Sequence, residues 1–382
     1  MNQAEEFFSD LKEWSARKLN IIEKYTGGFS KILGSRFKNV YYIDGFAGKG
    51  MYDNGEKGSP VLAAETAQRF QQNATSFTLH CINVEKDHEN YLNLDAETKK
   101  FDNLVQNYEG DFEDKVDEIL SKINKNPAVF FIDPFGIKGT SWEYVEKVIT
   151  RQDSTDIWIR FDHKTVRRLS GFYDSDAKEA SGKLLTLQNL FGITDSNYLR
   201  ERLGKGVTSD ERIKNAVALY IEQLEKAFSK AGKEGFAASY PIISIDGENK
   251  YHLIFACSHK KAATLASDIV NRIEETFQHE KEEYKEFQSG QMSLFSSDIT
   301  KEQVFEDKVM KLKKAILLLP KNKPSSREYL YYALMVENKS WFGKIRGKHL
   351  TQALRELLSE ASPKIKCVGT PGGDDSVFTL LE

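Results

Sequence analysis

The chain has 382 residues, which at about 150 residues per domain predicts two or three domains. Hydrophobic residues make up 40% and charged residues 29% of it, a balance typical of globular proteins that excludes a disordered polymer and a membrane bundle. The formal net charge of -3 excludes a molecule that is basic all over, so any surface for nucleic acid must be local.

No targeting or membrane segment is expected. The N-terminus MNQAEEFFSDLKEW lacks a cationic start followed by an apolar run, and no apolar stretch approaches the roughly 20 residues that cross a bilayer. Cys81, Cys257 and Cys367 are too far apart in the sequence for a disulfide framework or a metal knuckle. We therefore predict a cytoplasmic protein with reduced cysteines, no metal site and no membrane partner.

Strand-like and helical segments alternate after two N-terminal helices, which are expected over 7–25 and 29–37. The strands are expected over 39–45, 77–86, 103–112, 127–134 and 156–163. The helices between them are expected over 60–72, 87–100, 113–124 and 141–150. This βαβ series predicts an α/β domain built on a parallel sheet.

The alternation stops after the fifth strand. Residues 163–235 have a polar, helical composition and are expected to form an insertion. Two strand-like runs, 237–247 and 250–259, flank a Gly-Glu-Asn turn and predict an antiparallel hairpin. A parallel sheet with a terminal antiparallel hairpin is typical of the Rossmann-like class I methyltransferase fold, whereas dehydrogenases continue in parallel.

The expected domains follow from these segments. N-terminal helices over 1–38 pack on a core domain over 39–286, which a helix at 260–286 closes. A polar, Ser-rich linker then covers 287–300.

The last part, 301–382, carries 15 Lys and Arg against 10 Asp and Glu and is therefore basic. Helices are expected over 302–318, 324–336 and 346–360, followed by a hairpin around Pro371. Three helices and a hairpin in this order are typical of a winged helix-turn-helix domain.

Acidic residues follow three consecutive strands at one edge of the predicted sheet, where open α/β proteins bind ligands. Asp44 opens a glycine-rich turn that lets the backbone approach a ligand, and the Glu85 carboxylate can accept ribose hydroxyls. Asp111 can receive an adenine amino group, with Phe112 against the ring. The alternative is that Glu85 and Asp111 cap the helices after them. The predicted cofactor-binding residues are Asp44, Phe46, Gly48, Gly50, Glu85, Asp111 and Phe112.

A second motif, Asp133-Pro134-Phe135-Gly136, ends the fourth strand. A carboxylate and a proline carbonyl can accept hydrogen bonds from an exocyclic amine, while an aromatic ring stacks on the base that carries it. This directs the nitrogen lone pair toward an electrophilic methyl group, so that catalysis is mainly positioning. We predict Asp133, Pro134 and Phe135 as catalytic residues; the alternative is a proline turn after a buried strand.

The motifs YYIDGFAGKG, Gly58-Ser59-Pro60, FFIDPFGIKG and HLIFACS resemble those of the three-Cys-motif partner family of bacterial and phage proteins. The resemblance covers most of 15–285. It implies a fold like that of S-adenosylmethionine-dependent methyltransferases, S-adenosylmethionine as cofactor, and a winged-helix tail. It also implies a partner, a three-Cys-motif protein similar to radical S-adenosylmethionine enzymes. With this cofactor, Gly48 and Gly50 would flank the methionine part and Asp44 its amino group.

Two groups of cations are candidates for contact with nucleic acid. The first follows the fifth strand and comprises Arg160, His163, Lys164, Arg167 and Arg168. The second, Lys344, Arg346 and Lys348, lies at the start of the proposed recognition helix in the tail. The alternatives are a structural histidine and solvated faces in the first group, and a protein-docking winged helix in the second.

The linker contains Gln291-Met292-Ser293-Leu294-Phe295. This run resembles the peptide by which bacterial replication and repair proteins dock on the sliding clamp. Gln291, Leu294 and Phe295 would be the docking residues, and the alternative is that the two apolar residues hold the linker on the protein itself.

Three functions follow from these residues. The first is an S-adenosylmethionine-dependent methyltransferase acting on an amino group of a nucleic-acid base, most simply of DNA. The second is a non-catalytic adaptor that binds DNA and recruits the three-Cys-motif partner, in DNA repair or a phage-related role. The third is a nuclease in which Asp44, Glu85, Asp111 and Asp133 hold Mg²⁺.

Overall fold

The computed structural model describes residues 12–171, 179–204, 207–289, 297–373 and 375–381. Contacts divide the chain into two compact units, Met1–Ser258 and His259–Glu382. The helix at 260–289 therefore groups with the C-terminal unit, whereas the sequence assigns it to the sheet domain. Each unit is described by itself.

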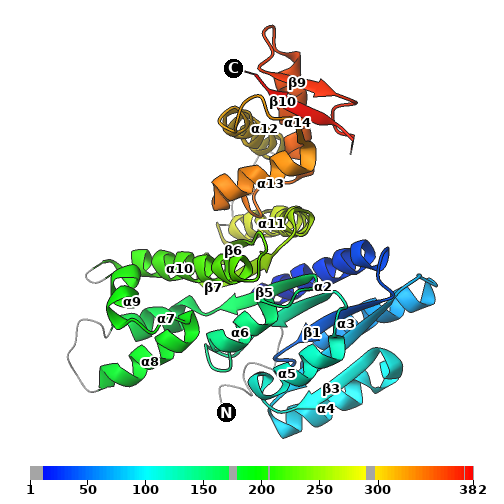
Figure 1. The fold of residues 1–382 in the computed structure, drawn as a ribbon, viewed down its shortest axis with the longest axis vertical. Helices are drawn as coiled ribbons and strands as arrows, with labels where there is room; N and C mark the ends of the chain where they lie inside the picture. Colours follow the sequence, from blue (N-terminus) through cyan, green and yellow to red (C-terminus); the bar gives the residue numbers. More distant parts are fainter. Residues whose placement is uncertain (1–11, 172–178, 205–206, 290–296, 374, 382) are drawn as a thin grey trace. The chain divides into compact units, whose positions relative to one another are not determined.

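A seven-stranded sheet forms the centre of the first unit (Figure 1), in the order β3-β2-β1-β4-β5-β7-β6. Its first five strands are mutually parallel, and β7 runs antiparallel to both of its neighbours. The strands are β1 (Asn39–Asp44), β2 (Thr78–Glu85), β3 (Val105–Glu109), β4 (Ala128–Ile132), β5 (Thr155–Phe161), β6 (Phe236–Ile243) and β7 (Asn249–Cys257). This confirms the predicted Rossmann-like sheet, which is parallel and ends in an antiparallel hairpin.

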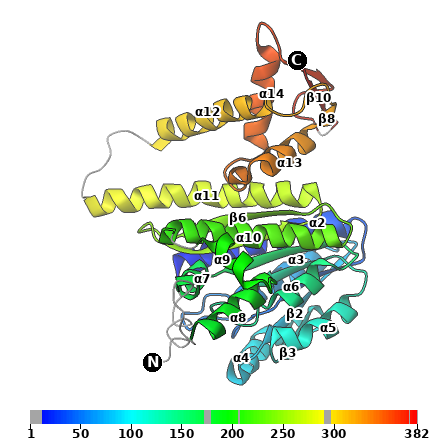
Figure 2. The same ribbon diagram turned by 60° about the vertical axis from the view of Figure 1, so that its left-hand side comes forward.

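Helices cover both faces of the sheet (Figure 2). One face carries α2 (Glu13–Gly34), α3 (Ser59–Gln72) and α4 (His88–Thr98), with the 3₁₀ helix η1 (Lys99–Leu104) before β3. The other face carries α5 (Phe112–Ile123), α6 (Trp142–Ile149) and α10 (Ser209–Lys230). Because both faces are covered, central strands such as β4 are buried along their whole length, as their apolar composition requires.

The N-terminal segment differs from the prediction. Residues 13–34 form the single helix α2, which continues through Gly27 and Gly28 where a break between two helices is expected. Buried Tyr25 and Phe29 lie on either side of these glycines and pack against each other with ring centroids 6.2 Å apart. Packing of this apolar face outweighs the low helix propensity of two glycines.

The region after β5 is helical, as expected for an insertion. It contains α7 (His163–Ser170), α8 (Glu179–Phe191) and α9 (Ser196–Leu203), which lead into α10. The buried side chains of these helices join those of α5 and α6 in one apolar core against the sheet. The insertion is thus part of the first unit's core.

The second unit comprises helices and a small sheet. The helices are α11 (Lys260–Ser289), α12 (Ser297–Ile316), α13 (Arg327–Glu337), η3 (Lys339–Trp341) and α14 (Gly347–Ser359). The strands are β8 (Ser325–Ser326), β9 (Ile365–Val368) and β10 (Val377–Leu380), in the order β8-β10-β9. The three predicted helices and the hairpin are present at the expected places, and the winged helix-turn-helix assignment stays a prediction.

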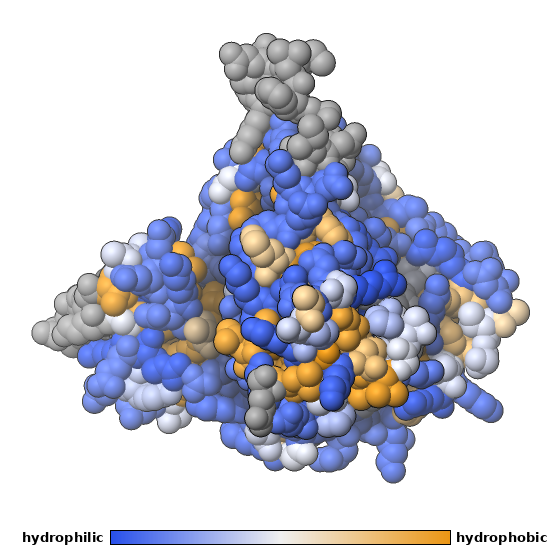
Figure 3. All heavy atoms as spheres, turned by 90° about the horizontal axis from the view of Figure 1, so that it is seen from above, coloured by the Kyte–Doolittle hydropathy of each residue, from blue (hydrophilic) through white to orange (hydrophobic). Residues whose placement is uncertain are grey.

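Among the described residues, the most exposed large apolar side chains are those of Leu318, Val368 and Phe135. Figure 3 shows one face of the molecule, on which hydrophilic side chains predominate and hydrophobic ones gather mainly near the centre of the view. Among the described helices, none has the length and apolar character needed to cross a bilayer.

Asp156 is a buried carboxyl group in β5, only 5% exposed. The Tyr25 hydroxyl of α2 donates a hydrogen bond of 2.6 Å to its Oδ2. Burial raises the pKa of Asp156 to about 7, because the charged form loses water that one hydrogen bond does not replace. Asp156 therefore links the packing of α2 on the sheet to pH.

Replacing Asp156 with Asn will remove a pH-dependent part of the free energy of unfolding. Between the unfolded pKa near 4 and the folded value near 7, the folded wild type binds more protons than the unfolded chain, so its stability falls as pH rises. Asn does not titrate. Urea unfolding at pH 5, 6, 7 and 8 should show Asp156→Asn gaining stability relative to wild type, on the order of 2 kcal/mol between pH 5 and pH 7. A constant difference across this range would contradict the assignment.

Candidate functional site

A cavity of about 230 Å³ lies at the carboxyl ends of β1, β2, β4 and β5. The strand order switches between β1 and β4, because β2 and β3 lie on one side of β1 and β4 and β5 on the other, and open α/β sheets bind ligands at such a switch point. The predicted residues that line the cavity are Phe46, Gly48, Gly50, Glu85, Asp133, Pro134, Phe135 and Arg160. Lys18, Tyr52, Ser59 and Asn90 also line it and were not predicted.

The turn after β1 forms one wall through its glycines. Gly48 and Gly50 have φ of 64° and 82°, in the left-handed region that favours glycine. The amide of Gly58 donates a 2.8 Å hydrogen bond to the Gly50 carbonyl, and a Cβ on Gly58 would lie 2.9 Å from that oxygen. The backbone at Gly58 thus lies close to the backbone at Gly50, and this contact holds the glycine turn in place as one wall of the cavity.

Glu85 ends β2 and is held by two backbone amides. Gly48 N–H donates to Oε2 at 2.7 Å and Asp87 N–H donates to Oε1 at 2.8 Å. Burial raises the pKa of Glu85, while the amide hydrogen bonds act in the opposite direction. A carboxylate has about four lone-pair sites, so each oxygen can accept a further hydrogen bond from a ligand in the cavity.

The alternative role of Glu85 as a helix cap is not what the structure shows. Asp87 caps α4, since its side chain accepts from Asn90 N at 2.9 Å. Glu85 is instead bonded to the glycine turn across the sheet edge.

Asp44 lies beneath the cavity, fully buried, and does not line it. Its oxygens accept from Tyr42 Oη and Phe46 N, each at 3.1 Å, and also from the Ser59 hydroxyl. Burial raises the pKa of Asp44 to about 6. The carboxyl group thus holds the turn, and its buried position does not favour the predicted contact with a ligand's amino group.

Asp111 and Phe112 are also outside the cavity. Asp111 is at the N-cap position of α5 and forms an exposed ion pair with Lys86 at 2.9 Å. Phe112 is 2% exposed and packs against Phe46, with ring centroids 6.1 Å apart. Phe112 therefore supports the cavity wall from the core. The Asp111 side chain makes no capping hydrogen bond to α5, so neither the capping alternative nor the predicted contact with an adenine amino group is seen for it.

Asp133 follows β4 and lies between two cations. Lys18 of α2 forms an ion pair with its Oδ2, and Arg160 Nε of β5 lies 3.7 Å from its Oδ1. The side chains of Lys18 and Asp133 are only 4% and 15% exposed. Arg160, predicted as a nucleic-acid contact, therefore belongs to the wall of this cavity.

Pro134 and Phe135 complete this side of the cavity. Arg160 Nη1 donates to the Pro134 carbonyl at 2.5 Å, so both predicted amine acceptors already receive a hydrogen bond or an ion pair. The Phe135 side chain is 64% exposed. Its ring lines the cavity with much of its surface exposed, which is where the predicted stacking role would place a planar group.

The remaining cations of the first predicted group lie on α7. Lys164, Arg167 and Arg168 are partly or fully exposed on one face of the helix. His163 is 3% exposed, packs edge-on against His252, and has its pKa lowered by burial. The structural alternative applies to His163, which is not a surface contact.

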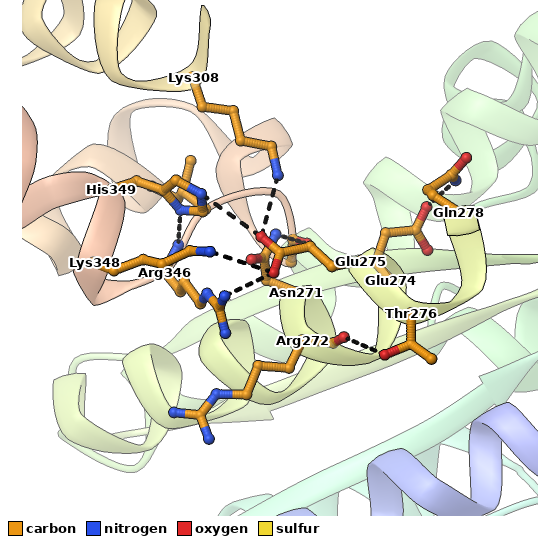
Figure 4. Close-up of polar contacts among 12 residues, drawn as sticks. Asn271, Arg272, Glu274, Glu275, Thr276, Gln278, Lys308, Arg346, Lys348 and His349 are labelled. Atoms are coloured by element: carbon orange, nitrogen blue, oxygen red, sulfur yellow. Dashed lines mark hydrogen bonds and ion pairs between the residues drawn. The ribbon is translucent and has the colours of Figure 1, made fainter. Parts of the chain in front are cut away.

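The cations at the start of α14 face an acid within the second unit (Figure 4). Glu275 of α11 accepts from Arg346 at 2.7 Å, and Lys348 and Lys308 lie 3.5 Å and 3.8 Å from its carboxylate. Asp268, also of α11, accepts from Gly347 N at 3.0 Å. In this arrangement α11 covers the end of the proposed recognition helix.

Other predicted sites have different outcomes. Lys344 lies in the turn before α14. The clamp-docking residues Gln291, Leu294 and Phe295 lie outside the described residues. Within the described ranges, no group of three or more His, Cys, Asp or Glu side chains is placed to hold a metal ion.

Lys18→Met will test whether the ion pair with Asp133 holds this part of the cavity. The change leaves a mostly buried carboxylate with only Arg160 near it, which should cost about 3 kcal/mol of unfolding free energy. Lys18→Met/Asp133→Asn removes the unpaired charge and should recover part of the loss. Urea unfolding of both variants measures this, and a double variant no more stable than Lys18→Met would rule out the coupling.

Comparisons with known proteins give distant structural similarity only. No family model and no curated protein sequence matches the chain. An O-methyltransferase from Bacillus cereus in complex with SAH is 13% identical, with a TM-score of 0.32, over 62% of this chain and 80% of that one. The O-methyltransferase TomG from Streptomyces achromogenes, in complex with SAM, is 12% identical, with a TM-score of 0.33, over 68% and 90%. These values are too low to transfer residue roles to this chain.

Proposed function

We propose that the chain binds S-adenosylmethionine in the cavity at the carboxyl edge of the sheet and transfers its methyl group. The observation that carries this proposal is the Glu85 carboxylate, fixed by the amides of Gly48 and Asp87 and facing the cavity. An acid at the end of the second strand, beside a glycine turn after the first, suits the two hydroxyls of a ribose.

The donor set fits such a cofactor. Glu85 offers free lone pairs, and the Gly48–Gly50 backbone offers a surface without side chains. Asn90 of α4 adds an amide on the side of Glu85. The cavity of about 230 Å³ is smaller than the roughly 300–1,000 Å³ of typical ligand pockets, so the cofactor would extend into the mouth beside Phe135. When bound, it would supply the electrophilic methyl group.

For the acceptor we propose an amino group on a nucleic-acid base. Asp133 and the Pro134 carbonyl each retain lone pairs after their contacts with Lys18 and Arg160. The two cations hold both acceptors in place through these contacts. An amine that donates to both oxygens would present its nitrogen lone pair to the methyl group, while the exposed Phe135 ring covers the base.

The other two functions receive less support from the geometry. The four carboxylates of the nuclease alternative do not meet at one point. Asp44 is buried and accepts hydrogen bonds from Tyr42 and Phe46, and Asp111 forms an ion pair with Lys86 outside the cavity. The adaptor alternative remains a proposal, because a non-catalytic protein that binds DNA and recruits a partner requires no ligand cavity. The three-Cys-motif partner and the sliding clamp remain proposed partners in either case.

Glu85→Ala will weaken binding of S-adenosylmethionine by about 10- to 100-fold, the cost of losing hydrogen bonds to a charged acceptor. Isothermal titration of the full chain measures this. The matched control is Glu109→Ala, which removes a carboxylate at the end of the neighbouring β3 that pairs with exposed His88 and does not line the cavity. Wild-type protein that fails to bind at millimolar ligand would remove the proposal.

Asp133→Ala will lower methyl transfer by at least about 100-fold, because the amine loses one of its two acceptors, while the cofactor still binds. The measurement is transfer of labelled methyl from S-adenosylmethionine to single-stranded DNA and RNA, followed by nucleoside analysis. Titration of the same variant with the cofactor shows whether the cavity is intact. Transfer that survives Asp133→Ala would contradict the assigned role.

A further inference from the structure

One face of α7 is built from cations. Lys164, Arg167 and Arg168 are spaced three and four residues apart, which places them on one side of a helix, and Gly171 follows on the same side. The opposite side is buried through His163, Val166 and Ser170. The helix is thus anchored in the core and presents its cationic face outward.

The cationic face is one wall of a second cavity, about 630 Å³ in volume, that is separate from the first. The other wall is the first turn of α10, which supplies Ser209 and Arg212. Arg212 is 9% exposed and its Nη2 lies 3.4 Å from the Gly204 carbonyl. Two helices that α8 and α9 separate in the sequence therefore bring four cations and a hydroxyl to one hollow.

Three acids near this hollow, Asp162, Glu211 and Glu248, have partners of their own, and Asp210 lies exposed in the first turn of α10. Glu248 forms ion pairs with Lys164 and Lys250, and the Asp162 side chain accepts from the amides of Lys164 and Thr165 at the start of α7. Glu211 takes part in the capping box of α10 with Thr208. In the part of the chain that the structure describes, no carboxylate lies within 4.0 Å of Arg167 or Arg168.

We propose that this cavity, defined by Lys164, Arg167, Arg168, Ser209 and Arg212, binds phosphate groups of a nucleic-acid backbone. Guanidinium groups are suited to phosphate oxygens, which they can contact through two donors at once. Ser209 adds a hydroxyl donor from the first turn of α10. The inference rests on the proposed function, whose substrate class it supports from outside the methyl-transfer cavity.

The two cavities lie at the same edge of the sheet. Arg160, at the end of β5, lines the first cavity, and α7, which begins two residues after β5 ends, lines the second. A backbone held on α7 could therefore place a neighbouring nucleotide beside Phe135. An enzyme that acts on a base must hold that nucleotide outside the base stack. Contacts to the phosphates position the strand, and the pocket then binds the base.

The test is binding of fluorescent single-stranded DNA and RNA oligonucleotides to the full chain in a salt series. Arg167→Ala/Arg168→Ala should weaken binding by about tenfold at low salt and reduce the slope of log K against log salt by about 1.4, the value for two lost phosphate contacts. Both residues are exposed, so the variant should melt at the wild-type temperature. The DNA and RNA arms show which backbone is preferred.

The matched control is Lys122→Ala/Lys125→Ala, which removes two exposed cations at the opposite edge of the sheet, just before β4. It should bind oligonucleotides as the wild type does. Equal losses in both double variants, or none in either, would overturn the proposed site. Oligonucleotide binding that depends on Arg167 and Arg168 in a chain that fails to bind S-adenosylmethionine would support this site while removing the proposed function.

Discussion

The hydrogen bonds from the amides of Gly48 and Asp87 to the Glu85 carboxylate are the interaction on which the site depends. The Gly48 hydrogen bond joins the turn after β1 to the end of β2, and the Asp87 hydrogen bond fixes the second carboxylate oxygen locally. A carboxylate fixed in this way needs little reorganisation to receive a pair of hydroxyl groups. The same bonds set the position of the glycine backbone against which a ligand would lie.

The other half of the site depends on charge. Asp133 is mostly buried and lies between Lys18 on one side and Arg160 on the other. Lys18 comes from α2, which also packs on the sheet through Tyr25 and Asp156. The helix before β1 is therefore part of the site as well as part of the fold, because its docking determines where the Asp133 carboxylate points.

The sequence could predict the sheet and most of the cavity wall. Strands that end in Asp or Glu locate the carboxyl edge, and glycines after β1 locate the backbone wall. The misassigned residues share one cause, the direction of the side chain. Asp44 and Tyr42 lie two residues apart on a strand, so their side chains point to the same face, and the Tyr42 hydroxyl donates a hydrogen bond to the Asp44 carboxylate. The alternation of side chains along a strand makes this shared face predictable from the sequence.

Other features depend on tertiary contacts that no local pattern reveals. Lys18 is 115 residues from Asp133, and a lysine on an amphipathic helix is ordinarily a solvated side chain. Glu275 is similarly distant from Arg346, so the pairing that engages the start of α14 could not be expected from the basic composition of the tail. In both cases the sequence identifies the charged residue and only the fold identifies its partner.

A crystal structure of the chain grown with S-adenosylhomocysteine would test the central claim most directly. We predict electron density for the ribose within hydrogen-bonding distance of both Glu85 oxygens, with the amides of Gly48 and Asp87 still bonded to the same carboxylate. An empty cavity at millimolar ligand, or a nucleoside bound elsewhere on the chain, would contradict it.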